Sequence, residues 1–305
     1  MEETTAVFLV TIIALFGSGF SLFTLMVILL DLKMRERPSS VPVVSFLLAA
    51  SIQGALAFPM YIYRKISDNH SANGVCDLYR VPYFFCGHIL TMSLLCISID
   101  RLIVILRPFL YQQHISSRRF CFVIICSWIV TGLIDVVPFV AHSDYSDDCF
   151  YNPNRDWGII VIVFYIIIPL IAITVSYLII WKKAVSITLQ EQKLTRSQSQ
   201  SRQQNESEHV RKAKNFSVME MKATKTSVVL IATYILCWGP LGIFYMVDNF
   251  CHNCYSSRNE LSGFRTGIKI LALTSSFTTP VVYCWWNKEF RVASKNLVKK
   301  IRKAF

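Results

Sequence analysis

The sequence has little charge and lacks the regular alternation of apolar and polar residues that a soluble domain needs. Only 16% of its 305 residues are charged, whereas 53% are hydrophobic. In a soluble domain the apolar residues would be spread along amphipathic helices and strands. Here they are gathered in runs of about twenty residues or more, each long enough to cross a bilayer as a helix. The composition therefore argues against a soluble domain.

Two further absences narrow the class of membrane protein. No internal repeat and no matching pair of broken helices is visible, although both are typical of transporters. His88 and Asp135 fall inside apolar runs, but alone they do not make the acid pair, histidine cluster or serine–histidine arrangement of a membrane enzyme. The sequence thus predicts neither a transporter nor an enzyme. We expect no catalytic residue, no metal and no cofactor.

Seven apolar runs predict an all-α bundle of seven transmembrane helices, because in lipid only helices and closed barrels satisfy the backbone. One domain, 1–305, is expected, with a short amphipathic eighth helix over 287–303. The polar segment 183–221 should be a mobile cytoplasmic loop whose two ends extend the neighbouring helices. The spans are expected at about 6–30, 41–63, 78–106, 120–141, 157–181, 222–249 and 264–286.

The formal net charge of +12 could indicate nucleic-acid binding, but its distribution does not. With the N-terminus outside, all but seven of the 31 lysines and arginines lie in cytoplasmic segments or at cytoplasmic helix ends. This asymmetry sets the orientation of membrane proteins and attracts anionic lipid. Because no basic start precedes the first run, we expect a first span there and not a cleaved signal peptide. The seven exceptions are Arg64, Lys65, Arg80, Arg155, Arg258, Arg265 and Lys269.

The most specific stretch runs from Cys76 to Tyr111. About seven helical turns, roughly 37 Å, separate Cys76 from the acid–base pair Asp100-Arg101. The stretch resembles the third transmembrane helix of rhodopsin-like G-protein-coupled receptors, which starts with a disulfide cysteine and ends in Asp-Arg-Tyr. Leu102 stands where the family usually has that tyrosine. The residues that match are Asp100, Arg101, Pro108 and Tyr111.

The resemblance covers nearly the whole chain. The family's Cys-Trp-x-Pro motif is matched from Cys237 to Pro240, and its Asn-Pro-x-x-Tyr motif from Thr279 to Tyr283, where Thr279 replaces the asparagine. Ser21 and Ser51 stand where relatives carry an asparagine and an aspartate, which puts a bound sodium ion in doubt. Further matches are Trp128 with Pro138, and Pro169 with Tyr177.

The resemblance implies a cell-surface receptor that converts binding of an extracellular ligand into activation of a heterotrimeric G protein. It places the chain in the plasma membrane with the N-terminus outside. In the resting state of the family the arginine, here Arg101, pairs with Asp100 and Glu220, and opening of the sixth span breaks the outer pair. The alternative is that these are ordinary interface charges. The implied switch residues are Asp100, Arg101, Tyr177, Glu220, Trp238, Pro240, Thr279, Pro280 and Tyr283.

Counting from Arg101 and Pro240 places one set of residues in the outer half of the bundle, as a ligand pocket. Amine receptors have an aspartate where Tyr83 lies, and opsins carry their retinal lysine where Leu273 lies. Lys269 leaves two interpretations open, namely a small acidic ligand with an apolar body or internal pairing with Asp248 or with an acid of the loop 144–148. The pocket residues are Tyr83, Phe84, Gly87, Tyr165, Trp238, Leu241, Tyr245 and Lys269.

Four of the ten cysteines fall on the expected outer side, where disulfides persist. The resemblance implies a Cys76–Cys149 bridge. Cys251 and Cys254 could form a small disulfide or, as a CxxC motif, serve metal or redox chemistry. An N-glycosylation sequon starts at Asn69. The other six cysteines, within the spans, are expected to be packing residues: Cys86, Cys96, Cys121, Cys126, Cys237 and Cys284.

One carboxylate, Asp135, falls within the fourth span, where it is costly unless it is paired or faces a cavity. His88 on the third span is the expected partner. A structural pair and a contact with the ligand both remain open for these two residues.

Overall fold

The computed structural model describes residues 2–66, 73–141, 155–198, 208–250 and 262–304. Every secondary-structure element within these ranges is helical. In chain order the elements are α1 (Glu2–Leu30), α2 (Leu32–Arg35), α3 (Ser40–Ile52), the π-helix η1 (Gln53–Ala57), α4 (Phe58–Ile66), α5 (Asn73–Leu106), α6 (Pro108–His114), α7 (Ser117–Ala141), α8 (Arg155–Ile162), the π-helix η2 (Val163–Ile167), α9 (Ile168–Gln198), α10 (Glu208–Phe250), α11 (Ser262–Trp286) and α12 (Lys288–Ala304).

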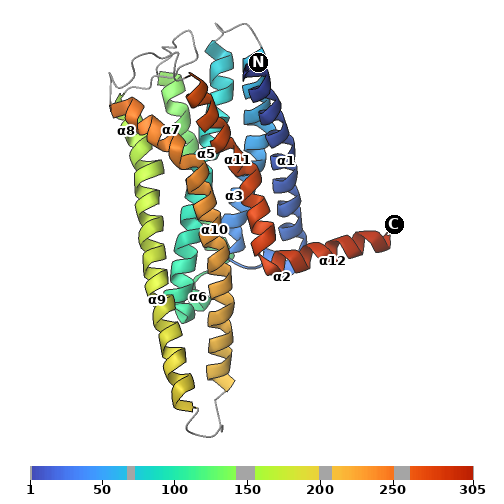
Figure 1. Ribbon diagram of the computed structural model, residues 1–305, viewed down its shortest axis with the longest axis vertical. Coiled ribbons are helices and arrows are strands. Elements are labelled where there is room, and N and C mark those ends of the chain that lie inside the picture. The colour runs from blue at the N-terminus through green and yellow to red at the C-terminus, as the bar shows by residue number, and fades with distance from the viewer. Residues whose placement is uncertain (1, 67–72, 142–154, 199–207, 251–261, 305) are drawn as a thin grey trace.

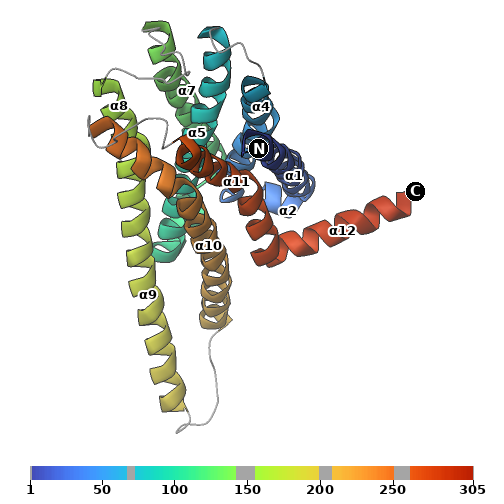
Figure 2. The same ribbon diagram turned by 45° about the horizontal axis from the view of Figure 1, so that its top comes forward.

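The long helices lie side by side and alternate in direction, so the described chain forms a single bundle (Figures 1 and 2). Helix α11 is also long enough to span, but it carries Arg265 and Lys269. It packs along α1 and α10 and so completes the expected seven-helix arrangement. Six stretches of the described chain are both long and apolar enough to cross a membrane: Val7–Leu30, Ser40–Met60, Val81–Leu106, Ser117–Val136, Gly158–Lys183 and Thr224–Val247.

Helix α5 is the centre of the bundle. It contacts α3, η1, α4, α7, η2, α9 and α10. Its sequence explains this position, because apolar and small residues occur on nearly all of its faces, as expected for a helix surrounded by other helices. Buried side chains follow one another from Tyr83 near its outer end to Val104 near its inner end. A side chain on α5 can therefore contact almost any other span.

The core divides into three clusters of buried residues. The outer cluster includes Tyr83, Leu241, Phe244 and Leu273; the middle cluster includes Phe46, Leu90, Leu94 and Tyr234; the inner cluster includes Val27, Leu47, Leu230, Tyr283 and Phe290. Trp238 packs against both the outer and the middle cluster, so its indole lies at the boundary between the two.

Two spans contain a π-helical turn that the hydrophobic runs did not predict. The N–H of Phe58 donates to the carbonyl of Gln53, and the N–H of Ile168 donates to that of Val163, five residues earlier in both cases. A proline follows each turn, Pro59 and Pro169, and proline lacks the N–H that a regular α-helix needs. The wider turn adds a residue without changing hydrophobicity, which is why the sequence pattern does not reveal it.

The segment between the fifth and sixth spans is more helical than expected. Helix α9 continues to Gln198 and α10 begins at Glu208, so much of the predicted loop 183–221 is helix. The expectation that its ends extend the two neighbouring spans is confirmed, and these extensions reach well beyond the other helices (Figure 1). Residues 199–207 lie outside the described ranges.

Helix α12 confirms the expected eighth helix and leaves the bundle at a steep angle to α11 (Figure 1). Asn287 starts it as an N-cap, since its Oδ1 accepts the N–H groups of Glu289 at 3.0 Å and Phe290 at 3.1 Å. Phe290 and Ala293 are buried against the bundle, whereas the lysines and arginines whose side chains are described are exposed. An ion pair between Arg37 and Glu289 joins the first inner loop to this helix.

The outer half of the bundle depends on a close approach between α1 and η1. A Cβ atom on Gly54 would lie 2.8 Å from the Cβ of Ser18 and 3.2 Å from its backbone. Because the obstacle includes backbone, a larger residue has to push the two helices apart. Gly19, which lies on the same helix as Ser18, has nothing within 4 Å of its Cβ position.

We therefore expect Gly54→Val to destabilise the protein by about 1–3 kcal/mol, the usual range for overpacking a tight contact. Gly19→Val is the matched control, since it adds the same side chain where space is open. The measurement is surface expression together with thermal unfolding of the purified protein in detergent. Equal losses for the two variants would contradict the close packing of α1 against η1.

Candidate functional site

Aromatic rings fill the outer half of the bundle at the predicted ligand site. Tyr83 lies 5.4 Å from Phe84 and 5.9 Å from Trp238, measured between ring centroids, and Phe84 lies 5.8 Å from Tyr245. Leu241 belongs to the same cluster as Tyr83. The structure thus brings these predicted residues from α5 and α10 together around one centre.

Trp238 is held at the floor of this aromatic group. Its Nε1–H donates to the Oγ of Ser275 on α11 at 2.8 Å, and its ring packs on Gly87 of α5. A Cβ on Gly87 would lie only 2.5 Å from the Cη2 of the indole, so glycine is needed for the ring to reach this place. The indole therefore connects α5, α10 and α11.

A polar corner adjoins the aromatic group between α5, α7 and η2. The Nδ1 of His88 lies 2.9 and 3.0 Å from the two carboxylate oxygens of Asp135, which confirms the predicted pair. The imidazole stacks on Tyr165 with 4.0 Å between centroids, and the Tyr165 hydroxyl donates to Thr131 at 3.2 Å. His88 also stacks on Phe84, so it links the predicted pocket residue Tyr165 to the rest of the pocket.

The cations at the outer end of α11 lie close to the same aromatic group. The guanidinium of Arg265 lies 5.4 Å from the ring centroid of Phe244. Lys269 is partly buried, and its chain neighbours Ile268 and Ile270 pack in the outer cluster. The loop 144–148 and the side chain of Asp248 lie outside the described residues, so the two interpretations of Lys269 stay open.

At the inner end of α5 the expected acid–base pair is present. The Nη2 of Arg101 lies 2.5 Å from the Oδ2 of Asp100, and both side chains are buried. The hydroxyl of Tyr111 on α6 donates to the other carboxylate oxygen of Asp100 at 2.7 Å. This second partner was not predicted, although Tyr111 was among the matched residues. Glu220 lies on α10, but its side chain is outside the described residues.

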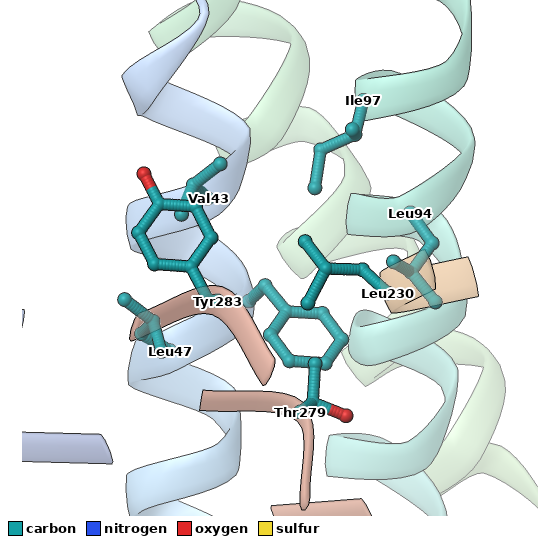
Figure 3. Close-up of a pocket in the computed structure, with 8 residues that line it drawn as sticks. Val43, Leu47, Leu94, Ile97, Leu230, Thr279 and Tyr283 are labelled. Carbon is teal, nitrogen blue, oxygen red and sulfur yellow. The ribbon is translucent and has the colours of Figure 1, made fainter. Parts of the chain in front are cut away.

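An apolar layer separates the aromatic group from Arg101. It surrounds a cavity of about 10 Å³, at the lower limit of the space that one water molecule needs. Figure 3 shows side chains from α3, α5, α10 and α11 that converge on it. In this conformation the layer closes the bundle between its outer and inner halves. The lining residues are Val43, Phe46, Leu47, Leu94, Ile97, Leu230, Thr279 and Tyr283.

The remaining switch residues lie around this layer. Tyr283 packs on Phe290, with 5.8 Å between ring centroids, while Tyr177 packs against the middle cluster. Pro240 lies inside α10 and Pro280 inside α11. The buried hydroxyl of Thr279 has no hydrogen-bond partner among the described residues. The substituted polar positions bond to backbone instead of facing an ion: Ser21 donates to the carbonyl of Ser276 and Ser51 to that of Leu47.

Several predictions concern the outer loops and fall outside the described residues. These are Cys149, Cys251, Cys254 and Asn69, together with the side chain of Cys76. The six cysteines expected to be packing residues are all free thiols, which confirms that expectation: Cys86, Cys96, Cys121, Cys126, Cys237 and Cys284.

Comparison with known proteins decides the family. Residues 21–283 match the family model described as 7 transmembrane receptor (rhodopsin family). The chain belongs to the rhodopsin family. A multi-pass membrane protein is what this family and the apolar helices together indicate.

Three relatives illustrate where the chain lies within the rhodopsin family. It is 25% identical to an octopamine receptor beta-2R from Chilo suppressalis over 73% of this chain and 61% of the relative. It is 25% identical to a GQ-coupled rhodopsin from Mizuhopecten yessoensis, over 93% and 57%, and 24% identical to human 5-hydroxytryptamine receptor 4, over 94% and 77%. The chain spans about half to three-fifths of the length of the first relatives that it matches.

We expect Asp135→Ala to destabilise this rhodopsin-family bundle by about 1–3 kcal/mol, because it leaves the buried His88 imidazole without its acceptor. Asp135→Asn is the matched control and should lose less, since its amide oxygen can still accept from Nδ1. Thermal unfolding in detergent measures both. The double change His88→Leu with Asp135→Leu should recover part of the loss. If Asp135→Ala were as stable as the wild type, the pair would have no structural role.

Proposed function

We propose that this chain is a plasma-membrane receptor that converts binding of an extracellular ligand into activation of a heterotrimeric G protein. The observation that carries the proposal is the arrangement along α5. The outer half of that helix supports the aromatic group, and its inner end holds the buried Asp100–Arg101 pair. A signal from one face of the membrane can therefore reach the other through a single helix and its neighbours.

The mechanism follows from the way in which α10 contacts α5. Pro240 removes one backbone hydrogen bond from α10, which weakens the helix at that level and allows it to bend. Trp238 lies directly below this point and contacts the aromatic group above and the middle cluster below. A ligand that displaces the aromatic rings would change the position of the indole, and the inner half of α10 would then move away from α5. Such a two-state element is what a receptor needs.

At the inner face Arg101 is the central group of the proposed switch. In the closed state it pairs with Asp100 and, as the resemblance implies, with Glu220 on α10. Opening of α10 would release Arg101 and break the apolar layer, leaving a cleft for a helix of the G protein. Tyr177 and Tyr283 lie on α9 and α11, on either side of that layer, and are suited to bridge in the open state. Thr279 and Pro280 would let α11 adjust.

Two features of the inner and outer surfaces complete the proposal. The basic, amphipathic α12 suits the anionic inner leaflet, with its charged side chains toward lipid headgroups. With the N-terminus outside, Cys76–Cys149 and Cys251–Cys254 would form disulfides and Asn69 would carry a glycan. These assignments rest on the sequence alone. The excess of positive charge needs no nucleic acid, because it follows the inner face.

The ligand differs from those named in the relatives. Tyr83 gives no carboxylate for an amine such as octopamine or 5-hydroxytryptamine, and Leu273 gives no lysine for a retinal linkage. The aromatic group and Lys269 instead suit a small ligand with an acidic group and an apolar body. Internal pairing of Lys269 with Asp248 or with the loop 144–148 remains the competing interpretation.

We expect Arg101→Ala to abolish G-protein activation while surface expression stays close to wild type. Glu220→Ala should raise basal signalling up to about fivefold, since it removes one partner of a partly exposed ion pair, of order 1 kcal/mol or less. The assay is a G-protein dissociation reporter in cells at matched expression. Unchanged signalling in both variants would exclude the proposed switch.

With an acidic agonist in hand, Lys269→Ala should reduce its potency strongly and Lys269→Arg should reduce it less, because arginine keeps the charge. Concentration–response curves at equal surface expression measure this. Equal potency in the wild type and both variants would rule out a ligand contact and favour internal pairing.

A further inference from the structure

A small polar junction joins α10 to α5 one turn below Trp238. The hydroxyl oxygen of Tyr234 lies 2.7 Å from the Oγ1 of Thr91 and donates to the carbonyl of Gly87 at 3.1 Å. Thr91 also donates to that carbonyl at 3.1 Å. Two hydroxyl protons serve three close contacts, so whichever proton arrangement is present, at least one hydrogen bond crosses between the helices.

The junction lies where water cannot replace these bonds. Tyr234 is buried in the middle cluster, packs edge-on against Phe46 and stacks on Trp238 with 5.8 Å between centroids. The ring is thus fixed by apolar contacts, and only its hydroxyl makes the polar link. A buried hydroxyl without a partner is unfavourable, so separating the helices here requires a new partner for Tyr234.

The position of the junction along α10 gives it its meaning. Tyr234 lies six residues before Pro240, on the inner side of the expected bend, so it moves with the half of α10 that must leave α5. Gly87 serves both neighbours, because its missing Cβ admits the Trp238 ring and its carbonyl accepts from Tyr234. The indole contact above and the hydroxyl bond below therefore hold the same pair of helices.

We propose that the hydrogen bonds from Tyr234 to Thr91 and Gly87 form a latch that holds the inner half of α10 against α5 and limits basal activity. The inference rests on the proposed function, in which separation of these two helices activates the G protein. The latch acts at mid-depth, well above the Arg101 pair, so each can be removed without touching the other.

The test compares four variants in the G-protein dissociation assay without agonist, at matched surface expression. Tyr234→Phe removes only the hydroxyl and should raise basal signalling about threefold or more, the size of a typical interhelical hydrogen bond within a membrane. Thr91→Val should raise it by a similar or smaller factor, since the Gly87 carbonyl still accepts from Tyr234. The double variant should match Tyr234→Phe and not exceed it. Thr233→Val is the control, because that hydroxyl donates to Val229 within its own helix, and it should signal like the wild type.

A second comparison separates this inference from the proposed function. Adding Arg101→Ala to Tyr234→Phe should return signalling to background. If neither Tyr234→Phe nor Thr91→Val raises basal signalling while Arg101→Ala still abolishes activation, the latch is wrong and the receptor function stands. A fall in basal signalling would assign the bond to the active state and equally overturn the latch. If Arg101→Ala signals normally, it is the proposed switch that fails.

Discussion

The packing of the Trp238 indole on Gly87 is the contact on which the rest of the structure depends. It brings α10 as close to α5 as a side chain allows, and it places Ser275, Tyr83 and Tyr234 around one ring. Above it lies the aromatic group and below it the apolar layer, so a change on either side must pass through this contact. Any side chain larger than hydrogen at Gly87 would have to displace the indole.

The bundle has a fixed side and a side built to separate. On the fixed side, His88–Asp135, Thr131–Tyr165 and the stacking of His88 on Tyr165 join α5, α7 and η2 by three contacts that close on each other. Breaking one strains the others, because all three share the same side chains. On the opposite side, α10 is held to α5 by the indole, by the Tyr234 hydroxyl and by the proposed pairing of Arg101. These contacts follow one another along the helix, so they can break in sequence as α10 bends.

Much of the fold could be predicted from the sequence, since seven apolar runs leave few alternatives in lipid and the motifs order the helices. The pairing of His88 with Asp135 was also predictable, because an acid within a span needs a partner. The π-turns were not, since an added residue leaves hydrophobicity unchanged. The hydroxyl contacts of Tyr234 and Tyr111 were missed for a related reason: a sequence shows that a hydroxyl is present, but only helix rotation decides which partner it meets. The unusual tyrosine at 234 was the available signal for the latch.

The most direct measurement is the distance between the inner ends of α10 and α7 in the purified receptor. Lys225 and Arg118 are both exposed, so Lys225→Cys and Arg118→Cys can carry spin labels once the exposed Cys121 is changed to serine. The account predicts a longer distance when a nucleotide-free G protein binds, and a shift toward that longer distance in Tyr234→Phe without any partner. A distance that stays the same with bound G protein would contradict a mechanism based on separation of α10 from α5.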